Sequence, residues 1–411
     1  MPKQPAGSAA DFSQKRRALF VTPENPFPTI GGGALRSASL LTYLAKHFAV
    51  DVVTFRQPGA PDPRATFPPG MAASVQVIDL PYHPKSAGHR IARNLTRAFH
   101  GRPPLIDRYS GFETEVAAAV QGRHYEIGFL EHFWCASYER LLRPHCTRVV
   151  LDLHNIESIW HAALARTERR DMRWLYRRFE TVCARMEKAL LPRFDHTLVT
   201  SHTDASHVAR IAPGVPTTVY PNAIPYYDRP AKQERHVVVF TGNLEYQPNR
   251  SAIFHFRDRI WPDLRQRWPT LIWEIIGKNP QSLHGIGQGD LRIHLIGPVD
   301  DAIARIASAQ VAVVPLLAGS GTRIKILEAW AAATPVVSTT IGAEGLHGCE
   351  GEELLIADRP AGFADAVHRL LSDPVLRTRI GNAGRKRYED EYSWEQAWMS
   401  LDKILKSTGA V

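Results

Sequence analysis

A run of small and basic residues in the last third of the chain carries side chains suited to anion chemistry. It reads Gly319-Ser320-Gly321-Thr322-Arg323-Ile324-Lys325, and Glu328 follows one turn later. A strand-like run at 311–315 precedes it and a helical pattern follows, so loop amides are predicted at the positive end of a helix dipole, where phosphate binds. Arg323 and Lys325 are poorly placed for that dipole, which favours a bound diphosphate.

Glu328 has the residue type and position to accept hydrogen bonds from two adjacent hydroxyls of a ribose. The alternative is an exposed helix acid that pairs with Lys325 or Arg323. A small-residue loop alone leaves both interpretations open.

The elements that must position this loop are short apolar runs alternating with helical patterns, typical of βα units around a parallel sheet covered on both faces. In the first half the runs are 18–22, 50–55, 75–80, 127–131, 148–153 and 197–200. In the second half they are 237–242, 271–277, 291–297, 311–316, 335–338 and 354–357. A proline-rich passage at 213–230 separates the two series. We therefore predict an α/β protein with domains at 1–225 and 226–390 and a closing helix at 391–411.

The residues around the loop resemble a known donor-site signature. Residues 326–331, 334–340 and 342–346 are similar to the signature of retaining glycosyltransferase family 4, whose members have the GT-B fold. The resemblance extends over most of the chain, through the glycine-rich run Gly31-Gly32-Gly33, the hinge-like 220–222 and the start of the second domain at 240–249. It implies two Rossmann-like, doubly wound domains that face a central cleft.

The resemblance also implies the roles of individual residues. Gly242 and Asn243 would bind the donor together with the loop and Glu328, and Gly32, Gly33 and Arg36 would face the acceptor or the diphosphate. His154 matches the position from which the family's histidine approaches the donor sugar, with a structural histidine as the alternative.

The family usually has paired glutamates eight positions apart, and Ser320 stands where the first would be. Any sugar contact made by that acid is therefore in question.

The implied reaction is a retaining transfer from a nucleotide diphosphate sugar to a hydroxyl acceptor, with Arg323 and Lys325 stabilising the leaving diphosphate. No cofactor beyond the donor substrate is expected. The Asp300-Asp301 pair lacks metal-site spacing and is interpreted as a helix N-terminal pair, so we predict metal-independent catalysis. Four scattered cysteines argue against a disulfide framework and a zinc site.

A basic amphipathic stretch at 85–108 is the main feature outside this site. It has six basic residues and one acid, with Ile91, Leu95 and Phe99 at helical spacing. Packing of these three side chains onto their own domain is the favoured interpretation, and docking to an anionic membrane is the alternative. The basic N-terminal stretch lacks the apolar core of a secretory signal, so we expect a cytoplasmic protein, with peripheral contact at the inner membrane face if the helix docks.

Two rival functions stay open. A nucleotide-sugar 2-epimerase on the same fold would need additional acid–base residues at the sugar. A degenerate, non-catalytic GT-B binding protein would fit the serine at position 320. Nucleic-acid binding is not expected, because no basic and aromatic module is recognisable. The donor base, the sugar and the acceptor, lipid-linked or soluble, are not readable from this sequence.

Overall fold

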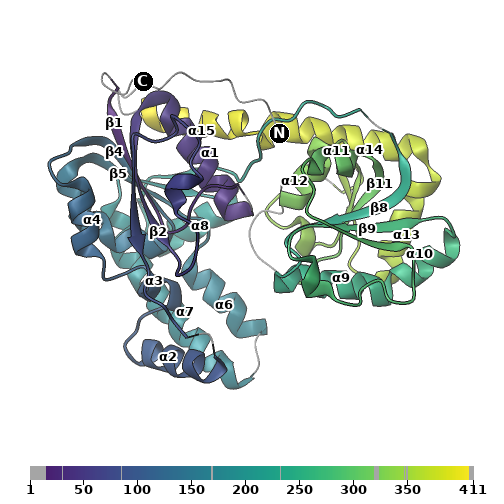
Figure 1. Cartoon of the computed structure of the whole chain (residues 1–411), viewed down its shortest axis with the longest axis horizontal. Coiled ribbons are helices and arrows are strands. Elements are labelled where there is room, and N and C mark those ends of the chain that lie inside the picture. The colour runs from purple at the N-terminus through teal and green to yellow at the C-terminus, as the bar shows by residue number, and fades with distance from the viewer. Residues whose placement is uncertain are drawn as a thin grey trace. The chain divides into compact units, whose positions relative to one another are not determined.

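The chain divides into two compact units, coloured by residue number in Figure 1. A computed structural model describes residues 15–29, 31–84, 86–167, 170–231, 233–318, 324–346, 348 and 350–406. Within these, the N-terminal unit contains 15–221 and 398–406, and the C-terminal unit contains 222–397. The boundary therefore follows Pro221, and the last helix is divided between the two units at Trp398.

The N-terminal unit is built on a parallel seven-stranded sheet with the order β3-β2-β1-β4-β5-β6-β7. The strands are β1 Arg17–Thr22, β2 Ala49–Arg56, β3 Ser74–Asp79, β4 Tyr125–Glu131, β5 Cys146–Asp152, β6 His196–Val199 and β7 Thr217–Val219. The central strands are buried along nearly their whole length, as their continuous apolar runs predict. Strand order reverses at β1, which lies between β2 and β4.

Helices alternate with these strands along the chain, as in a doubly wound domain. They are α1 Gly32–His47, α2 Ala87–Phe99, α3 Pro104–Arg108, α4 Glu113–Val120, α5 Glu139–Leu142, α6 Glu157–Thr167, α7 Arg170–Leu190 and α8 His202–Ile211, and a 3₁₀ segment covers Phe133–Tyr138. The basic stretch at 85–108 thus contains two helices rather than one. The final helix of the chain is α15 Trp394–Lys406.

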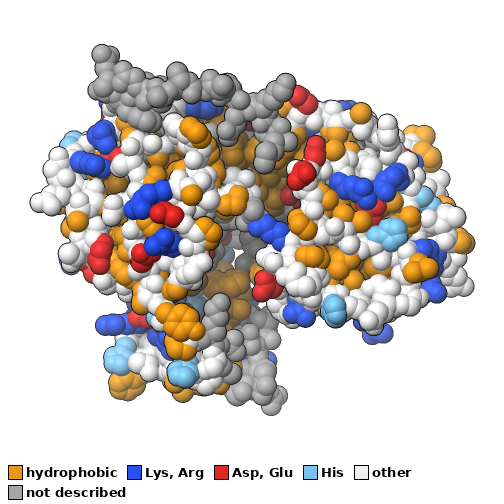
Figure 2. Space-filling view, in the orientation of Figure 1, with side chains coloured by type: hydrophobic (Ala, Val, Ile, Leu, Met, Phe, Trp, Pro, Cys, Tyr) orange, Lys and Arg blue, Asp and Glu red, His pale blue; other side chains and the backbone are white. Residues whose placement is uncertain are grey.

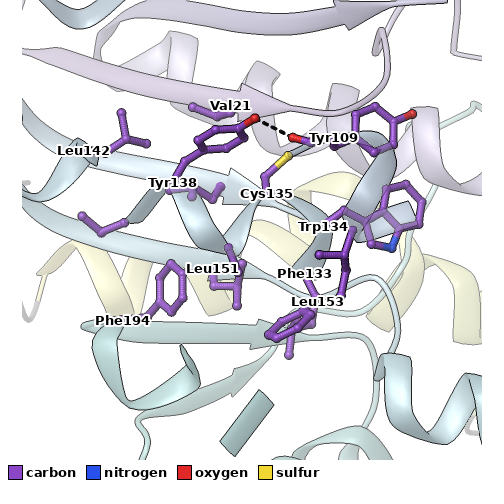
Figure 3. Close-up of a cluster of buried hydrophobic side chains, with 14 of the residues drawn as sticks. Val21, Tyr109, Phe133, Trp134, Cys135, Tyr138, Leu142, Leu151, Leu153 and Phe194 are labelled. Atoms are coloured by element: carbon purple, nitrogen blue, oxygen red, sulfur yellow. Dashed lines mark hydrogen bonds between the residues drawn. The ribbon is translucent and has the colours of Figure 1, made fainter. Parts of the chain in front are cut away.

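The core of the N-terminal unit lies against β4 and β5, and Figure 3 shows part of it. Trp134, Cys135 and Tyr138 come from the 3₁₀ segment and pack with Leu151 and Leu153. The Tyr138 hydroxyl donates to the carbonyl oxygen of Tyr109 at 2.5 Å, so its one polar atom is satisfied inside the core. This packing fixes the segment that follows β4.

The C-terminal unit has a parallel six-stranded sheet with the order β10-β9-β8-β11-β12-β13. Its strands are β8 Arg235–Thr241, β9 Ile272–Ile276, β10 Ile293–Gly297, β11 Ala309–Val314, β12 Val336–Ser338 and β13 Leu354–Ile356. Its helices are α9 Gln247–Arg259, α10 Trp261–Arg267, α11 Ala302–Ala307, α12 Ile324–Ala331, α13 Pro360–Ser372 and α14 Pro374–Arg387. The predicted pair of doubly wound domains is confirmed.

Asp301 caps α11, since its carboxylate accepts from the Ala304 amide at 2.9 Å. This confirms its interpretation as a helix N-terminal acid.

The apolar side chains of α2 correct one expectation. Ile91, Leu95 and Phe99 are 50%, 46% and 84% exposed, so packing of these side chains onto their own domain, the favoured interpretation, is only partial for Ile91 and Leu95 and does not hold for Phe99. The helix instead uses Ala98, which packs on Leu175 and Phe179 of α7. Figure 2 shows hydrophobic side chains on the surface around α2. Among the described residues, no helix is long and apolar enough to cross a membrane.

Candidate active site

The carboxyl ends of the C-terminal unit's strands form the first part of the site. Strand order reverses where β8 lies between β9 and β11. In open parallel sheets, ligands bind at such a switch point, beyond the carboxyl ends of the strands. Thr241 ends β8, α9 follows it, and α12 follows β11. Lys325 and Glu328 on α12 therefore come from the element expected to line this point.

Side chains from three elements meet there. The Lys325 ammonium donates to the Asn249 side-chain oxygen of α9 at 3.2 Å and lies 5.7 Å from the ring centre of Phe240. The Thr241 hydroxyl donates to a carboxylate oxygen of Glu328 at 3.0 Å. The structure thus brings together a fixed cation and a fixed carboxylate on successive turns of one helix.

Glu328 is half-buried, so its interpretation as an exposed helix acid is wrong. Burial raises the pKa of its carboxyl, while the bond from Thr241 and the charge of Lys325 lower it. The Thr241 bond occupies one oxygen, and a carboxylate has capacity for further donors. Ribose hydroxyls are donors of that kind.

Two glycines allow the backbone to pass closely beside these side chains. Gly242 has φ +150°, and a methyl group on it would lie 2.8 Å from the Asn249 side-chain nitrogen. Gly277, with φ +156°, follows β9, and a methyl there would lie 1.7 Å from the Gly242 carbonyl oxygen. Asn243 accepts from the Glu245 amide and organises the turn before α9. The predicted loop residues Gly319, Ser320, Gly321, Thr322 and Arg323 lie outside the described residues.

The carboxyl ends of β4 and β5 in the N-terminal unit carry a second cluster. Glu131 ends β4, Asp152 ends β5, and His154 follows two residues later. Nε2 of His154 lies 3.3 Å from an oxygen of Asp152 and 3.5 Å from an oxygen of Glu131. Burial lowers the pKa of the His154 imidazole, but the two adjacent carboxylates of Asp152 and Glu131 outweigh it, and the net shift is upward. The charged imidazolium is therefore favoured.

Arg36 differs from its expected role. Its guanidinium, 1% exposed, donates from Nε to Asp152 at 2.8 Å and also to the Tyr220 carbonyl at 2.6 Å. The Arg36 guanidinium is therefore not exposed for contact with an acceptor or a diphosphate, because it forms a buried ion pair with Asp152. The Arg36 charge holds the pKa of Asp152 well below its usual range, against the opposing effect of burial.

The glycine run lies at the start of α1. Gly31 is the N-cap residue with φ +101°, and Gly32 and Gly33 begin the helix with no side-chain cap and no acid in the first turn. A methyl group on Gly33 would lie 3.9 Å from Nδ1 of His154. The start of α1 and the His154 ring are thus adjacent, an arrangement suited to an electron-rich oxygen.

Among the described residues, one group has metal-like geometry. Single ligand atoms of Glu131, Asp152 and His154 lie within 4.8 Å of one another. Arg36 already compensates the charge of Asp152, so a cation there would be repelled by the guanidinium and by a protonated His154. These residues fit an internal ion-pair network better than a metal site.

Sequence reasoning did not identify Glu131 or His132 as part of this cluster. His132, with its ring 3.6 Å from the ring of His154, follows a buried strand and has φ +58°. Two signals were available: an acid at the end of a predicted central strand, and its alignment with Asp152 across β4 and β5. Parallel register alone places such residues side by side.

The chain has the two doubly wound domains of the GT-B class of glycosyltransferase folds, each with polar side chains at its carboxyl edge. Residues 235–373 match the family model described as Glycosyl transferases group 1. The C-terminal unit therefore contains a glycosyl transferases group 1 domain, and this matched range includes both Lys325 and Glu328.

Comparisons with individual proteins agree with this assignment. The phosphatidyl-myo-inositol mannosyltransferase of Mycobacterium leprae (strain TN) is 35% identical over 176 residues, which cover 41% of this chain and 46% of that protein. The chain spans about half the length of the curated relatives it matches.

Two solved structures resemble the whole chain. A sucrose-phosphate synthase from Thermosynechococcus elongatus has a TM-score of 0.72 at 18% identity and covers 96% of this chain and 100% of its own. The Anabaena protein Alr3699/HepE in complex with UDP-glucose has a TM-score of 0.63 at 14% identity, with coverage of 95% and 99%. At these identities the likeness shows the fold.

Proposed function

We propose that this protein is a glycosyltransferase that moves a sugar from a nucleotide diphosphate sugar to a hydroxyl acceptor. The observation that carries the proposal is the pair Lys325 and Glu328, held by Asn249 and Thr241 at the switch point of a glycosyl transferases group 1 domain. A nucleoside diphosphate needs a cation for its phosphates and an acceptor for its ribose hydroxyls, and this helix offers both. The Anabaena neighbour, whose structure contains UDP-glucose, supports a donor of this chemical class.

In the proposed mechanism, Lys325 and Arg323 stabilise the negative charge that develops on the leaving diphosphate as the glycosidic bond breaks. Two protein cations in this role make the reaction independent of a metal. Resemblance to glycosyltransferase family 4 implies retention of anomeric configuration, with attack of the acceptor hydroxyl on the same face and proton transfer to the departing phosphate. His154 donates a hydrogen bond to a substrate oxygen.

A nucleotide-sugar 2-epimerase would use an acid–base pair of carboxylates at the sugar. Glu131 and Asp152 are such carboxylates, but Arg36 and His154 engage them as an ion-pair network. Group transfer is therefore the better proposal. Formation of an epimerised nucleotide sugar without an acceptor would reverse this choice.

The exposed face of α2 supports the proposal that the acceptor is bound to a membrane. Ile91, Leu95 and Phe99 expose one apolar face, and the stretch 85–108 has six basic residues with a single acid, Asp107. Arg97 pairs with that acid at 2.8 Å, which leaves the surrounding field positive. Burial of the three side chains in an interface would contribute about 1–2 kcal/mol each, in addition to attraction to anionic lipid. We infer docking to the inner face of the membrane, where a lipid-linked acceptor is reached.

The relative from Mycobacterium leprae, named for transfer to a phosphatidyl-myo-inositol, is consistent with such an acceptor. Co-sedimentation with vesicles of phosphatidylcholine containing phosphatidylglycerol tests the docking. Phe99→Ser and Leu95→Ser should weaken binding, and Leu291→Ser, at an equally apolar residue that is 95% exposed, is the matched control. Equal binding by all variants would refute docking through α2.

Calorimetric titration of nucleoside diphosphates and their sugars, with and without Mg²⁺, tests the donor site. Wild type should bind one base selectively without Mg²⁺, and Lys325→Met should lose most of that affinity. Lys386→Met is the control, because Lys386 is an exposed lysine of α14 paired with Asp390. Absence of binding to every member of the panel would favour the degenerate, non-catalytic alternative.

A further inference from the structure

His132 holds a backbone conformation that side chains rarely adopt. Its φ of +58° and ψ of +144° belong to a region almost restricted to glycine. The residue is nevertheless a histidine, 8% exposed, directly after β4. Strain of this kind persists where the surroundings impose it, and it concentrates at functional sites.

The His132 ring is part of a column of four aromatic rings. Its centre lies 3.6 Å from the ring of His154 on one side and 4.1 Å from the ring of Trp134 on the other. Trp134 stacks on Tyr109 at 5.6 Å, and its indole nitrogen donates to Glu157 at 2.8 Å. Since Trp134 and Tyr109 are buried in the core shown in Figure 3, the column has a fixed base.

Glu131 is the second unusual neighbour of His154. Its side chain is fully buried, and neither carboxylate oxygen accepts a hydrogen bond from any residue that the structure describes. Its ionic contact is Nε2 of His154, at 3.5 Å. A buried carboxylate without compensation is costly, so a cation at His154 is the most economical explanation of its presence.

We propose that Glu131 and His132 are positioning residues that hold His154 as an imidazolium whose Nδ1–H alone is available to a ligand oxygen. Glu131 and Asp152 lie 3.5 and 3.3 Å from Nε2, and the adjacent ring of His132, with 3.6 Å between ring centres, limits the rotation of the His154 ring. Nδ1 is then directed toward the start of α1, where Gly33 leaves room for a ligand. That the ligand oxygen is a hydroxyl or phosphate of a sugar substrate rests on the proposed function, but the charge state does not.

The groups around His154 are consistent with a positive charge on His154 and a neutral His132. The groups that face it are Glu131, Asp152, Glu24, Arg36 through Asp152, and His132. Burial and the adjacent positive charge of His154 hold the pKa of His132 well below its usual range, so His132 is neutral. A neutral ring facing a charged one is attractive, whereas two charged rings at this separation would repel.

Histidine NMR of the full-length protein, labelled with ¹³C at Cε1 and free of nucleotide, tests the proposal. The His154 signal, identified by its loss in His154→Gln, should titrate above the ordinary value of about 6.5. Glu131→Gln should lower that midpoint by at least about one pH unit. Glu187→Gln, a buried acid of the same unit that bonds Ser158, is the control and should leave it unchanged. A His154 midpoint at or below the ordinary value, or one unaffected by Glu131→Gln, would overturn the proposal.

His132 variants separate positioning from backbone strain. His132→Gly relieves the strained φ, whereas His132→Ala retains it, so the glycine variant should have the higher Tm. Both remove the ring and should broaden or shift the His154 signal equally. If His132→Gly leaves that signal unchanged, His132 does not position His154. Nucleotide binding measured on the same samples shows separately whether the proposed donor site works.

Discussion

Replacement of Arg36 by methionine tests the buried ion network of the N-terminal unit. Arg36 and Asp152 are 1% and 0% exposed, so the variant leaves a carboxylate buried without its main partner. Loss of one partner of such a pair costs about 3–5 kcal/mol of unfolding free energy. Arg56→Met is the matched control, because Arg56 makes the same two-point contact with Asp79 on the surface, where solvent weakens it.

The effect should depend on pH in a defined direction. The pKa of Asp152 is depressed in the folded protein, so its stabilisation is present above the unfolded value near 3.9 and is lost as pH falls below it. The Arg36→Met deficit should therefore be full at pH 7 and shrink in acid. Hydrogen exchange of peptides from β5 measures the stability of the N-terminal unit separately, since the two units need not unfold together. Equal losses in Arg36→Met and Arg56→Met would refute the account.

Three further predictions concern other parts of the fold. Glu328→Gln should weaken binding of the preferred nucleoside diphosphate about 10- to 100-fold by calorimetry, as expected for loss of a charged hydrogen-bond acceptor, with no comparable fall in Tm. Gly277→Ala should destabilise the C-terminal unit strongly, because the methyl would overlap a backbone oxygen, while Gly289→Ala, at φ +82° with open space, should cost much less in a urea titration. Burial raises the pKa of Glu157 to about 7 in the folded protein. Between about pH 4.5 and 7 the carboxyl therefore ionises more readily in the unfolded chain, and the free energy of unfolding falls as pH rises through this range. Glu157→Gln should therefore gain stability over wild type at pH 8 and show no gain at pH 4, measured as Tm.

The sheets were predictable from sequence for a physical reason. Parallel strands covered on both faces need continuous apolar runs, and each of the twelve predicted runs became a strand within a few residues of its predicted bounds. The short strand β7 lies outside these runs, in the proline-rich passage. The place of Lys325 and Glu328 in the fold was predictable in the same way, because a helix that follows a strand in this topology starts at the carboxyl edge of the sheet.

The side-chain partners were not predictable from local patterns. Arg36 bonds Asp152, which is 116 residues later, so no spacing rule reveals that its charge is already used. The exposed face of α2 has the periodicity of a packed helix, and only the placement of Ala98 against α7 shows which side is turned inward. His132 has no sequence signal for a glycine-like backbone, because the strain follows from tertiary packing.

The division of α15 at Trp398 affects how the protein is made. From Trp398 onward this last helix packs on α1, where the indole nitrogen donates to Ser39 and Asp402 accepts from the Tyr43 hydroxyl at 2.7 Å. The first domain to leave the ribosome thus contains contacts that only residues translated after the C-terminal unit can supply. The N-terminal unit therefore lacks these contacts until the whole C-terminal unit has been translated. A fragment ending at Pro221 would expose the surface of α1 that α15 covers.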